Sequence, residues 1–320
     1  MKKIVGVSLG SSKRDHEVDV EMFGEKYNIK RLGTDGDVNK AINIIESLDG
    51  NVDAIGLGGI DAYLWLGEKR YPIKDAKKLM KAAKITPIVD GSGLKNTLEK
   101  RAIFLFDMEL AKKQNKKLVG KKVLMVSAVD RYGMAEAFYS SGCKILYGDL
   151  IFGLNIPLPI RSYKNFVRIA RLVLPIVTNL PFEILYPTGE KKDKEPSEKY
   201  TKYYEEADII AGDFHLIKKY MPKDMTGKWV ITNTTTASDV EDMKNRNVNI
   251  LVTTTPNLEG RSFGTNVMDA AFFAHIKSKN PHITWDQVLS SHMYFDLLNE
   301  INYFPRIEEL NRLMIKIDFD

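Results

Sequence analysis

The chain has 320 residues, 44% of them hydrophobic and 28% charged, so it can form one large or two ordinary globular domains. Its 47 basic and 42 acidic residues give a net charge of +5, and no block of basic residues resembles a nucleic-acid-binding arm. A single cysteine, Cys143, excludes an internal disulfide and a cysteine-rich metal site.

Targeting and metal-binding signals are missing from the sequence. The N-terminal apolar run is shorter than a signal peptide needs, and no stretch of about 18 uninterrupted apolar residues occurs. We therefore expect a cytoplasmic protein without a transmembrane helix. The histidines have no metal-ligand spacing, so no metal site is expected. Neither a P-loop nor a G-x-S-x-G elbow is present, which argues against a P-loop kinase and a serine hydrolase.

Short apolar runs alternate with helix-like stretches along most of the chain, which predicts an α/β protein with parallel strands. The expected strands are 4–8, 52–57, 87–89, 122–126, 144–148, 208–212, 229–232 and 250–253. The expected helices are 38–48, 75–84, 94–113, 132–141, 238–246 and 264–277.

The order of these elements predicts two lobes, one a Rossmann-like parallel sheet and the other a discontinuous α/β substrate lobe. The stretch KKQNKKLVGKK after the long helix is a natural crossing between them. The expected N-terminal substrate lobe covers 1–115, and the Rossmann-like lobe covers 116–262 with an apolar insert at 150–206. Helices in 263–320 are expected to return to the first lobe.

Residues 121–150 follow the order of a dinucleotide-binding unit: strand, turn, helix, strand and acid. The phosphate-binding glycines are replaced by Ala128 and Asp130, and only the third, Gly133, is kept. Asp149 lies 21 residues after Ala128, as expected for an acid that binds the ribose 2′-hydroxyl and disfavours NADP. Any dinucleotide is therefore expected to be NAD, although Asp130 adds bulk and negative charge beside the pyrophosphate. An ordinary acid at a strand end is the alternative for Asp149.

Further cofactor-site candidates lie in the same loop and at the ends of later strands. Ser127 and Arg131 flank the altered glycine positions, and Arg131 can offset part of the charge of Asp130. Asn233 and Thr234 follow an expected strand and are predicted to line the same cleft, because ligands gather at the C-terminal ends of strands.

The N-terminal lobe carries two other candidates. Ser8 and Ser11 belong to a serine-rich loop after the first strand, which suits hydrogen bonding to a substrate or an ordinary helix cap. Asp90 ends a short strand before Gly91-Ser92-Gly93 and a long helix, where it can handle a proton or cap the helix.

The stretch 89–93, VDGSG, resembles the T-D-G-x-G motif of shikimate and quinate dehydrogenases, with valine in place of threonine. The chain is also similar over its length to clostridial proteins labelled quinate 5-dehydrogenase, and more distantly to acyl-carrier-protein reductases. The resemblance implies that Asp90 works beside a lysine on the hydroxyl being oxidised. It also implies that Ser8, Ser11 and Asn266 contact substrate. The family's N-V-T-x-P-x-K lysine motif is absent, and Lys74 is a stand-in chosen from nearby residues.

The insert carries four cations, Arg161, Lys164, Arg168 and Arg171, at spacings that place them on one face of a short helix. Five prolines argue against a continuous helix across 150–189. A solvated basic face is the plain interpretation. An anionic substrate, a partner groove or an anionic lipid surface contacted through 161–174 are the functional ones.

The leading functional prediction is an NAD(P)-type oxidoreductase that removes hydride from a small polyhydroxy acid such as quinate or shikimate. One alternative is a non-redox ligand-binding or regulatory protein on a Rossmann-like fold. A second alternative is a reductase of an acyl or lipid-like substrate. The substrate, the cofactor, the catalytic lysine and the oligomeric state are not fixed by the sequence.

Overall fold

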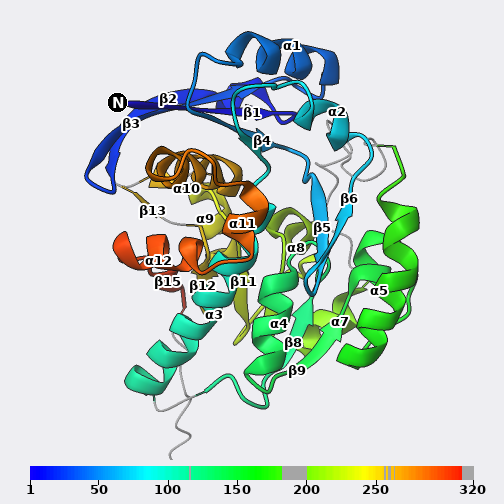
Figure 1. Cartoon of the computed structure of the whole chain (residues 1–320). Helices are drawn as coiled ribbons and strands as arrows, with labels where there is room; N and C mark the ends of the chain where they lie inside the picture. Colours follow the sequence, from blue (N-terminus) through cyan, green and yellow to red (C-terminus); the bar gives the residue numbers. More distant parts are fainter. Residues whose placement is uncertain (115–116, 182–199, 256, 259–260, 263, 312–320) are drawn as a thin grey trace, which may run out of the picture. The chain divides into compact units, whose positions relative to one another are not determined.

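The structure, a computed structural model, describes all residues except 115–116, 182–199, 256, 259–260, 263 and 312–320. The chain forms an α/β protein with two mixed, mostly parallel sheets (Figure 1), which confirms the predicted fold class. Contacts divide it into two compact units. Unit 1 contains Met1–Glu99, Val167–Lys192 and Thr255–Phe304, and unit 2 contains Lys100–Phe166, Asp193–Thr254 and Pro305–Asp320.

The expected domain borders at 115 and 262 stay predictions. Of the borders between the two units, one falls inside helix α3 (Ser92–Gln114) and another inside helix α5 (Tyr163–Val177), so neither lies in a polar linker. The C-terminal region is also shared, because helices α10 to α12 belong to unit 1 and strand β15 to unit 2. Part of the predicted insert, 182–199, lies outside the described residues.

Unit 1 is built on a five-stranded sheet with the order β2-β3-β1-β4-β7, in which only β2 is antiparallel to its neighbour. The strands of this sheet are β1 (Lys2–Ser8), β2 (His16–Met22), β3 (Glu25–Gly33), β4 (Ala54–Gly58) and β7 (Ile88–Val89). Two separate antiparallel pairs are formed by β5 (Tyr63–Leu66) with β6 (Lys69–Pro72) and by β13 (Asn257–Leu258) with β14 (Arg261–Ser262). The helices of unit 1 are the 3-10 turn η1 (Ser12–Arg14), α1 (Val38–Leu48), α2 (Ala76–Met80), α10 (Thr265–Lys279), α11 (Trp285–Leu289) and α12 (Met293–Glu300).

The hairpin of β2 and β3 was missed in the search for apolar runs, although the alternation of charged and apolar residues in β2 is typical of a half-buried strand. The turn uses Phe23 and Gly24, both at positive φ (54° and 67°), a backbone form that matches the twist of hairpin strands. Strand β3 then pairs parallel with β1. The small hairpin of β5 and β6 was missed as well.

Helix α10 lies close to the sheet because two glycines in neighbouring strands leave room for its first turn. Gly6 of β1 and Gly56 of β4 are paired in register. A Cβ on Gly56 would lie 2.5 Å from the backbone oxygen of Asn266, and one on Gly6 would lie 2.6 Å from Cγ2 of Val267. Helices α1 and α2 bury Ala41, Ile45, Ala76 and Leu79 in a core with apolar side chains of β1 and β4 (Figure 1). The close approach of α10 to Gly56 shows that the glycine-rich stretch 56–59 has a packing role.

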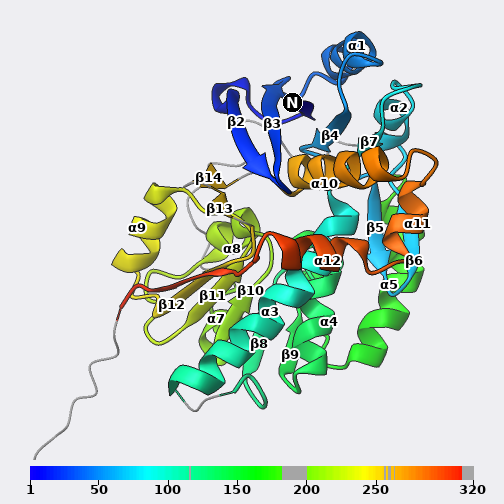
Figure 2. The ribbon, with the colours of Figure 1, turned by 60° about the vertical axis from the view of Figure 1, so that its left-hand side comes forward.

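Unit 2 contains a six-stranded sheet with the order β15-β12-β11-β10-β8-β9, whose strands are parallel except β15 (Figure 2). Its strands are β8 (Lys122–Met125), β9 (Lys144–Tyr147), β10 (Ile209–Ala211), β11 (Trp229–Thr232), β12 (Ile250–Thr253) and β15 (Arg306–Glu309). Its helices are α4 (Tyr132–Ser140), the π-helical turn η2 (Asp149–Gly153), α7 (Thr201–Glu206), α8 (Phe214–Tyr220) and α9 (Ala237–Asn245).

The strand order of unit 2 locates the place where a ligand is expected to bind. Counted from β8, the parallel strands run 2-1-3-4-5, the doubly wound order of flavodoxin-like sheets and not the 3-2-1-4-5-6 order of dinucleotide-binding dehydrogenases. Successive strands are added on one side of β8 for β9 and on the other side for β10, so the strand order reverses between β8 and β10. In open α/β sheets ligands bind at the C-terminal ends of the strands that flank such a switch point.

Most predicted elements are present, and α1, β11 and β12 have the predicted bounds. Helix α5 is the short helix expected within 150–189, and it continues through Pro175. Within the described residues, no helix is both long and apolar enough to cross a bilayer.

We predict that Gly56→Ala lowers the stability of the protein, because the added methyl group would overlap the backbone of α10. Overpacking of this kind costs about 1–3 kcal/mol. Thermal unfolding followed by circular dichroism measures the effect. Gly153→Ala is the matched control, since no atom lies within 4 Å of a Cβ built there. Equal melting temperatures for the two variants would contradict the close contact.

Candidate functional site

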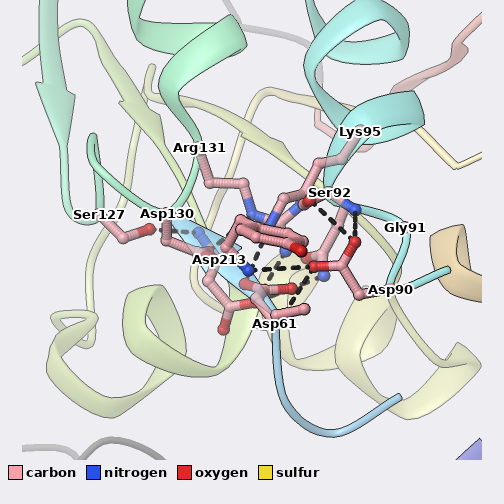
Figure 3. A network of polar contacts seen from close by, with 12 residues as sticks. Asp61, Asp90, Gly91, Ser92, Lys95, Ser127, Asp130, Arg131 and Asp213 are labelled. Carbon is pink, nitrogen blue, oxygen red and sulfur yellow. Dashed lines mark hydrogen bonds and ion pairs between the residues drawn. The ribbon is translucent and has the colours of Figure 1, made fainter. Parts of the chain in front are cut away.

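The candidate site of unit 2 lies at the switch point between β8 and β10. The hydroxyl of Ser127, after β8, accepts a hydrogen bond from the backbone amide of Asp213, after β10, at 3.0 Å (Figure 3). Gly212 permits this approach with φ of 135°, and a Cβ there would lie 2.7 Å from Cγ2 of Val126. The loops after β8 and β10 are therefore in direct contact at this edge.

Arg131 holds the polar groups at this edge together. Its guanidinium is buried, with Nη2 3.1 Å from Oδ2 of Asp213 and Nε 3.2 Å from Oδ2 of Asp130 (Figure 3). Asp213 also caps α8 by accepting from the amide of His215. Asn233 donates to Asp213 at 3.4 Å and accepts from the amide of Phe214.

The side chains of Asp130 and Asp213 retain 30% and 27% exposure, so part of each side chain is open to solvent. The switch point therefore presents partly exposed carboxylates over a buried arginine.

The side chain of Asp149 lies against the turn between β8 and α4 and not in an open cleft. Its Oδ1 accepts a hydrogen bond from the amide of Val129 at 2.8 Å. Burial raises the pKa of this carboxyl to about 6, and hydrogen bonds from the amides of Val129 and Ala128 oppose the rise. Oδ2 is buried and makes no hydrogen bond within the described part of the chain. A carboxylate thus occupies the amides that a phosphate would use in a dinucleotide-binding loop.

The remaining cofactor candidates of the sequence are spread along the same edge. Gly133 is buried in the first turn of α4, which fits the packing role of the third motif glycine. Asn233 joins the network of Asp213, whereas Thr234 is exposed. The structure therefore brings Ser127, Arg131 and Asn233 together around Asp213. The binding of a dinucleotide by these residues stays a prediction.

Asp90 of unit 1 is buried and accepts several hydrogen bonds from the chain itself (Figure 3). Oδ1 accepts from the amide and hydroxyl of Ser92, and Oδ2 accepts from the amide of Ala62 at 2.6 Å and from that of Tyr63 at 3.3 Å. Asp90 therefore caps α3 and holds the loop after β4 through hydrogen bonds from its amides. A role in moving protons remains a prediction.

The lysine that lies in this loop cluster is Lys95, one turn into α3. Its Nζ is 3.1 Å from Oδ2 of Asp61, and both side chains are largely buried. Asp61 directly precedes Ala62, whose amide is bound by Asp90. Lys74 is exposed, and the contacts described for Asp90 do not include it. Sequence reasoning missed Lys95 and Asp61, although Lys95 follows the Asp90 turn and Asp61 ends the glycine-rich loop.

Two of the three substrate-binding candidates meet at one glycine. A Cβ on Gly58 would lie 2.8 Å from Nδ2 of Asn266 and 3.3 Å from Cβ of Ser8. Asn266 donates to the backbone oxygen of Gly56, and the Ser8 hydroxyl accepts from the amide of Gly10. Ser11 lies apart as the cap of η1, accepting from the amide of Lys13. Each of these side chains has a local structural partner, and their contact with substrate is a prediction.

A second buried acid, Asp269 on α10, was not singled out in the sequence. It accepts hydrogen bonds from the hydroxyl of Tyr294 and from the amide of Gly91 at 3.1 Å, and Trp285 donates to the Tyr294 hydroxyl. Burial raises the pKa of Asp269 to about 8. The hydrogen bond from Tyr294 lowers this pKa, and the negative charge of Asp90 raises it further. The available signal was an acid inside the apolar stretch VMDAAFFA.

Cys143 is unsuited to nucleophilic chemistry. Burial raises the pKa of its thiol to about 12, and its Sγ lies 3.3 Å from the backbone oxygen of Leu118. The thiolate is therefore scarce at neutral pH.

The chain is a two-unit α/β protein in which polar side chains gather at the C-terminal ends of strands in each unit. A family model described as "Domain of unknown function (DUF8754)" matches residues 93–310, and a second, "Domain of unknown function (DUF8753)", matches residues 3–90. The chain belongs to the DUF8754 family. The two models meet at the turn after Asp90. No curated protein matches the sequence.

Solved structures resemble the chain only distantly. A galactofuranose binding protein is 14% identical, with 97% of this chain and 95% of that chain covered and a TM-score of 0.39. The hetero-hexameric glutamate dehydrogenase from Thermus thermophilus is 10% identical, with 94% and 74% covered and a TM-score of 0.44. A dipicolinate synthase polypeptide from Bacillus halodurans is 12% identical, with 88% and 98% covered and a TM-score of 0.31. These likenesses concern the general α/β fold.

We predict that stability falls as pH rises towards 8 because of Asp269. A carboxyl with a raised folded-state pKa holds its proton more tightly in the folded protein, so its contribution is complete below the unfolded value near 3.8 and is lost as pH approaches about 8. One such group gives a slope of at most about 1.4 kcal/mol per pH unit. Asp269→Asn should flatten the stability profile between pH 5 and 8, measured by urea unfolding. Parallel profiles for the two proteins would contradict the prediction, whatever their absolute stabilities.

Proposed function

We propose that the chain is a non-redox binding protein for a small hydroxyl-rich acid, held at the C-terminal edge of β8 and β10. The observation that carries this proposal is the place of Asp149. Its carboxylate already occupies the amides of the turn between β8 and α4, where a dinucleotide would put its pyrophosphate. An anionic phosphate there would have to displace a bound carboxylate.

The charges at the same edge also disfavour a pyrophosphate. This edge carries three carboxyl groups, those of Asp130, Asp149 and Asp213. The cation of the described network is Arg131, which pairs with Asp130 and Asp213. Like charges a few ångströms apart in partly screened surroundings repel by about 1–4 kcal/mol. A pyrophosphate would bring two further negative charges into this edge.

The same groups suit a ligand rich in hydroxyls. Ionised carboxylates accept hydrogen bonds and hydroxyl groups donate them, so the partly exposed carboxylates of Asp130 and Asp213 can accept further hydrogen bonds from ligand hydroxyls. Arg131 below them supplies a positive charge that tolerates a single ligand carboxylate. These properties favour the polyhydroxy-acid class that the sequence resemblance implies, without hydride transfer.

A dehydrogenase of the same ligand class is the second candidate, and it is favoured by the pair of Lys95 and Asp61 beside the Asp90 loop. A lysine and a carboxylate in hydrogen-bond contact can take the proton of a carbinol hydroxyl during oxidation. This candidate requires NAD or NADP to bind, and so a binding titration separates the two functions. Nothing in the geometry of the described residues favours an acyl reductase.

The direct test is calorimetric titration of the whole chain with quinate, shikimate and L-arabinose, and with NAD and NADP. We expect binding of a hydroxyl-rich probe and no binding of either dinucleotide at millimolar concentration. Asp213→Asn keeps a residue able to cap α8 but weakens the pair with Arg131, and it should lower probe affinity about tenfold or more. Asp224→Asn, an exposed acid elsewhere in unit 2, is the control.

Dinucleotide binding below millimolar concentration would support the dehydrogenase and overturn the proposal. Failure of every hydroxyl-rich probe to bind would count against both candidates.

A second prediction addresses Asp149 itself. Asp149→Ala removes the carboxylate from the loop amides and should cost about 1–3 kcal/mol by leaving them without a partner. Sulfate should restore part of this loss by binding the vacated amides, as phosphates bind at such loops. Thermal unfolding with sulfate against chloride at equal ionic strength measures the rescue.

The control for this rescue is Asp107→Ala, which also removes a carboxylate from one backbone amide, that of Leu118. Wild type and Asp107→Ala should show only the general effect of sulfate. An equal gain in all three proteins would mean that the loop amides do not receive an anion.

A further inference from the structure

Helix α5 carries an exposed face that neither unit's candidate site uses. Sequence 150–182 contains no acidic residue, four cations and many apolar residues, in a chain whose acids and bases are otherwise nearly balanced. Within it, Leu172 and Ile176 are 75% and 68% exposed. Single exposed apolar residues are ordinary, but large ones at i and i+4 on one helix form a continuous surface.

The cations of α5 continue the same row of side chains. Lys164, Arg168, Leu172 and Ile176 follow at spacings of four, so each lies one turn along the helix and about 40° further round it. Arg171 stands beside Arg168 on the cationic side. The exposed arc is therefore basic along one edge and aliphatic along the other, while Phe166, Ala170 and Leu174 are buried on the opposite side.

Arg161 does not belong to the exposed face of α5 in the structure. It precedes the first residue of α5 and forms an ion pair with Glu206 at 2.7 Å. For Lys164, Arg168 and Arg171 no ion pair is found with any of the described residues, and all three are exposed. The cationic face predicted from the sequence thus reduces to these three side chains.

Exposed apolar residues also precede the helix. Leu154, Ile156 and Leu158 are exposed, and they alternate with residues of a segment that contains Pro157 and Pro159. Five of the large apolar side chains found exposed in the described residues therefore lie between positions 154 and 176. The segment is enriched in the aliphatic and basic groups that a membrane interface accepts.

We propose that α5 binds the surface of an anionic lipid bilayer, with Leu172 and Ile176 inserted at the level of the headgroups and Lys164, Arg168 and Arg171 against the lipid phosphates. Charge complementarity and the adjoining aliphatic residues favour this occupant. A nucleic acid would use the cations but gain nothing from leucine and isoleucine. The helix lies on the membrane and does not span it, in agreement with the lack of a spanning helix among the described residues.

The test is sedimentation of the whole chain with vesicles of phosphatidylcholine that contain 30 mol% phosphatidylglycerol. Binding is expected at low salt, should weaken as salt rises, and should be absent with vesicles of phosphatidylcholine alone. Pelleting no greater with anionic than with neutral vesicles would overturn the proposal.

Two double variants separate the halves of the face. Lys164→Glu with Arg168→Glu should lower partitioning at least about 25-fold, since each cation contributes about fivefold. Leu172→Ser with Ile176→Ser should lower it about tenfold or more by removing the inserted methyl and methylene groups. Both variants change exposed side chains, and circular dichroism checks that they fold.

Matched controls exist on other elements, in unit 1. Lys77→Glu with Lys78→Glu reverses two exposed charges on α2, and Ile85→Ser removes an isoleucine that is 78% exposed. Neither control should change partitioning by more than about twofold beyond the general effect of net charge. If the controls reduce binding as much as the α5 variants, the attraction is unspecific and the proposed surface is wrong.

Discussion

The hydrogen bond from the amide of Val129 to the carboxylate of Asp149 is the contact on which the ligand edge of unit 2 depends. It fixes the turn between β8 and α4, and with it the start of α4 where Arg131 lies. Arg131 then holds Asp213, which caps α8 after β10. The two loops at the switch point are therefore linked through one buried carboxyl, which accepts hydrogen bonds from the chain's own amides.

Unit 1 uses a buried carboxyl in a related way. Asp90 accepts the amides of Ala62 and Tyr63 from the loop after β4 and caps α3 through Ser92. The same loop carries Asp61, whose pair with Lys95 completes the polar edge. In both units an acid at a strand end binds backbone amides, and its neighbours are the residues of the proposed sites. This is the physical reason why the acids most prominent in the sequence are not the most accessible ones.

The outer face of helix α5 differs in chemistry from the strand-end carboxylates of the two units. Its buried side chains anchor it through Phe166, Ala170 and Leu174, while its outer face combines cations with aliphatic residues. The proposed ligand edge presents carboxylates beside a buried arginine, whereas the outer face of α5 presents cations and aliphatic side chains. Binding of a small acid and association with an anionic surface can therefore be altered by separate substitutions.

The sequence by itself determined the α/β class, the bounds of α1, β11 and β12, and the concentration of polar residues at strand ends, because these follow from local periodicity. Only the tertiary structure decided the strand order, the pairing of Lys95 with Asp61 and the burial of Asp149 and Asp269. Strand order and side-chain pairing arise between segments far apart in the chain, such as β4 and α10. No local pattern records whether an acid at a strand end faces a ligand or the amides of its own protein.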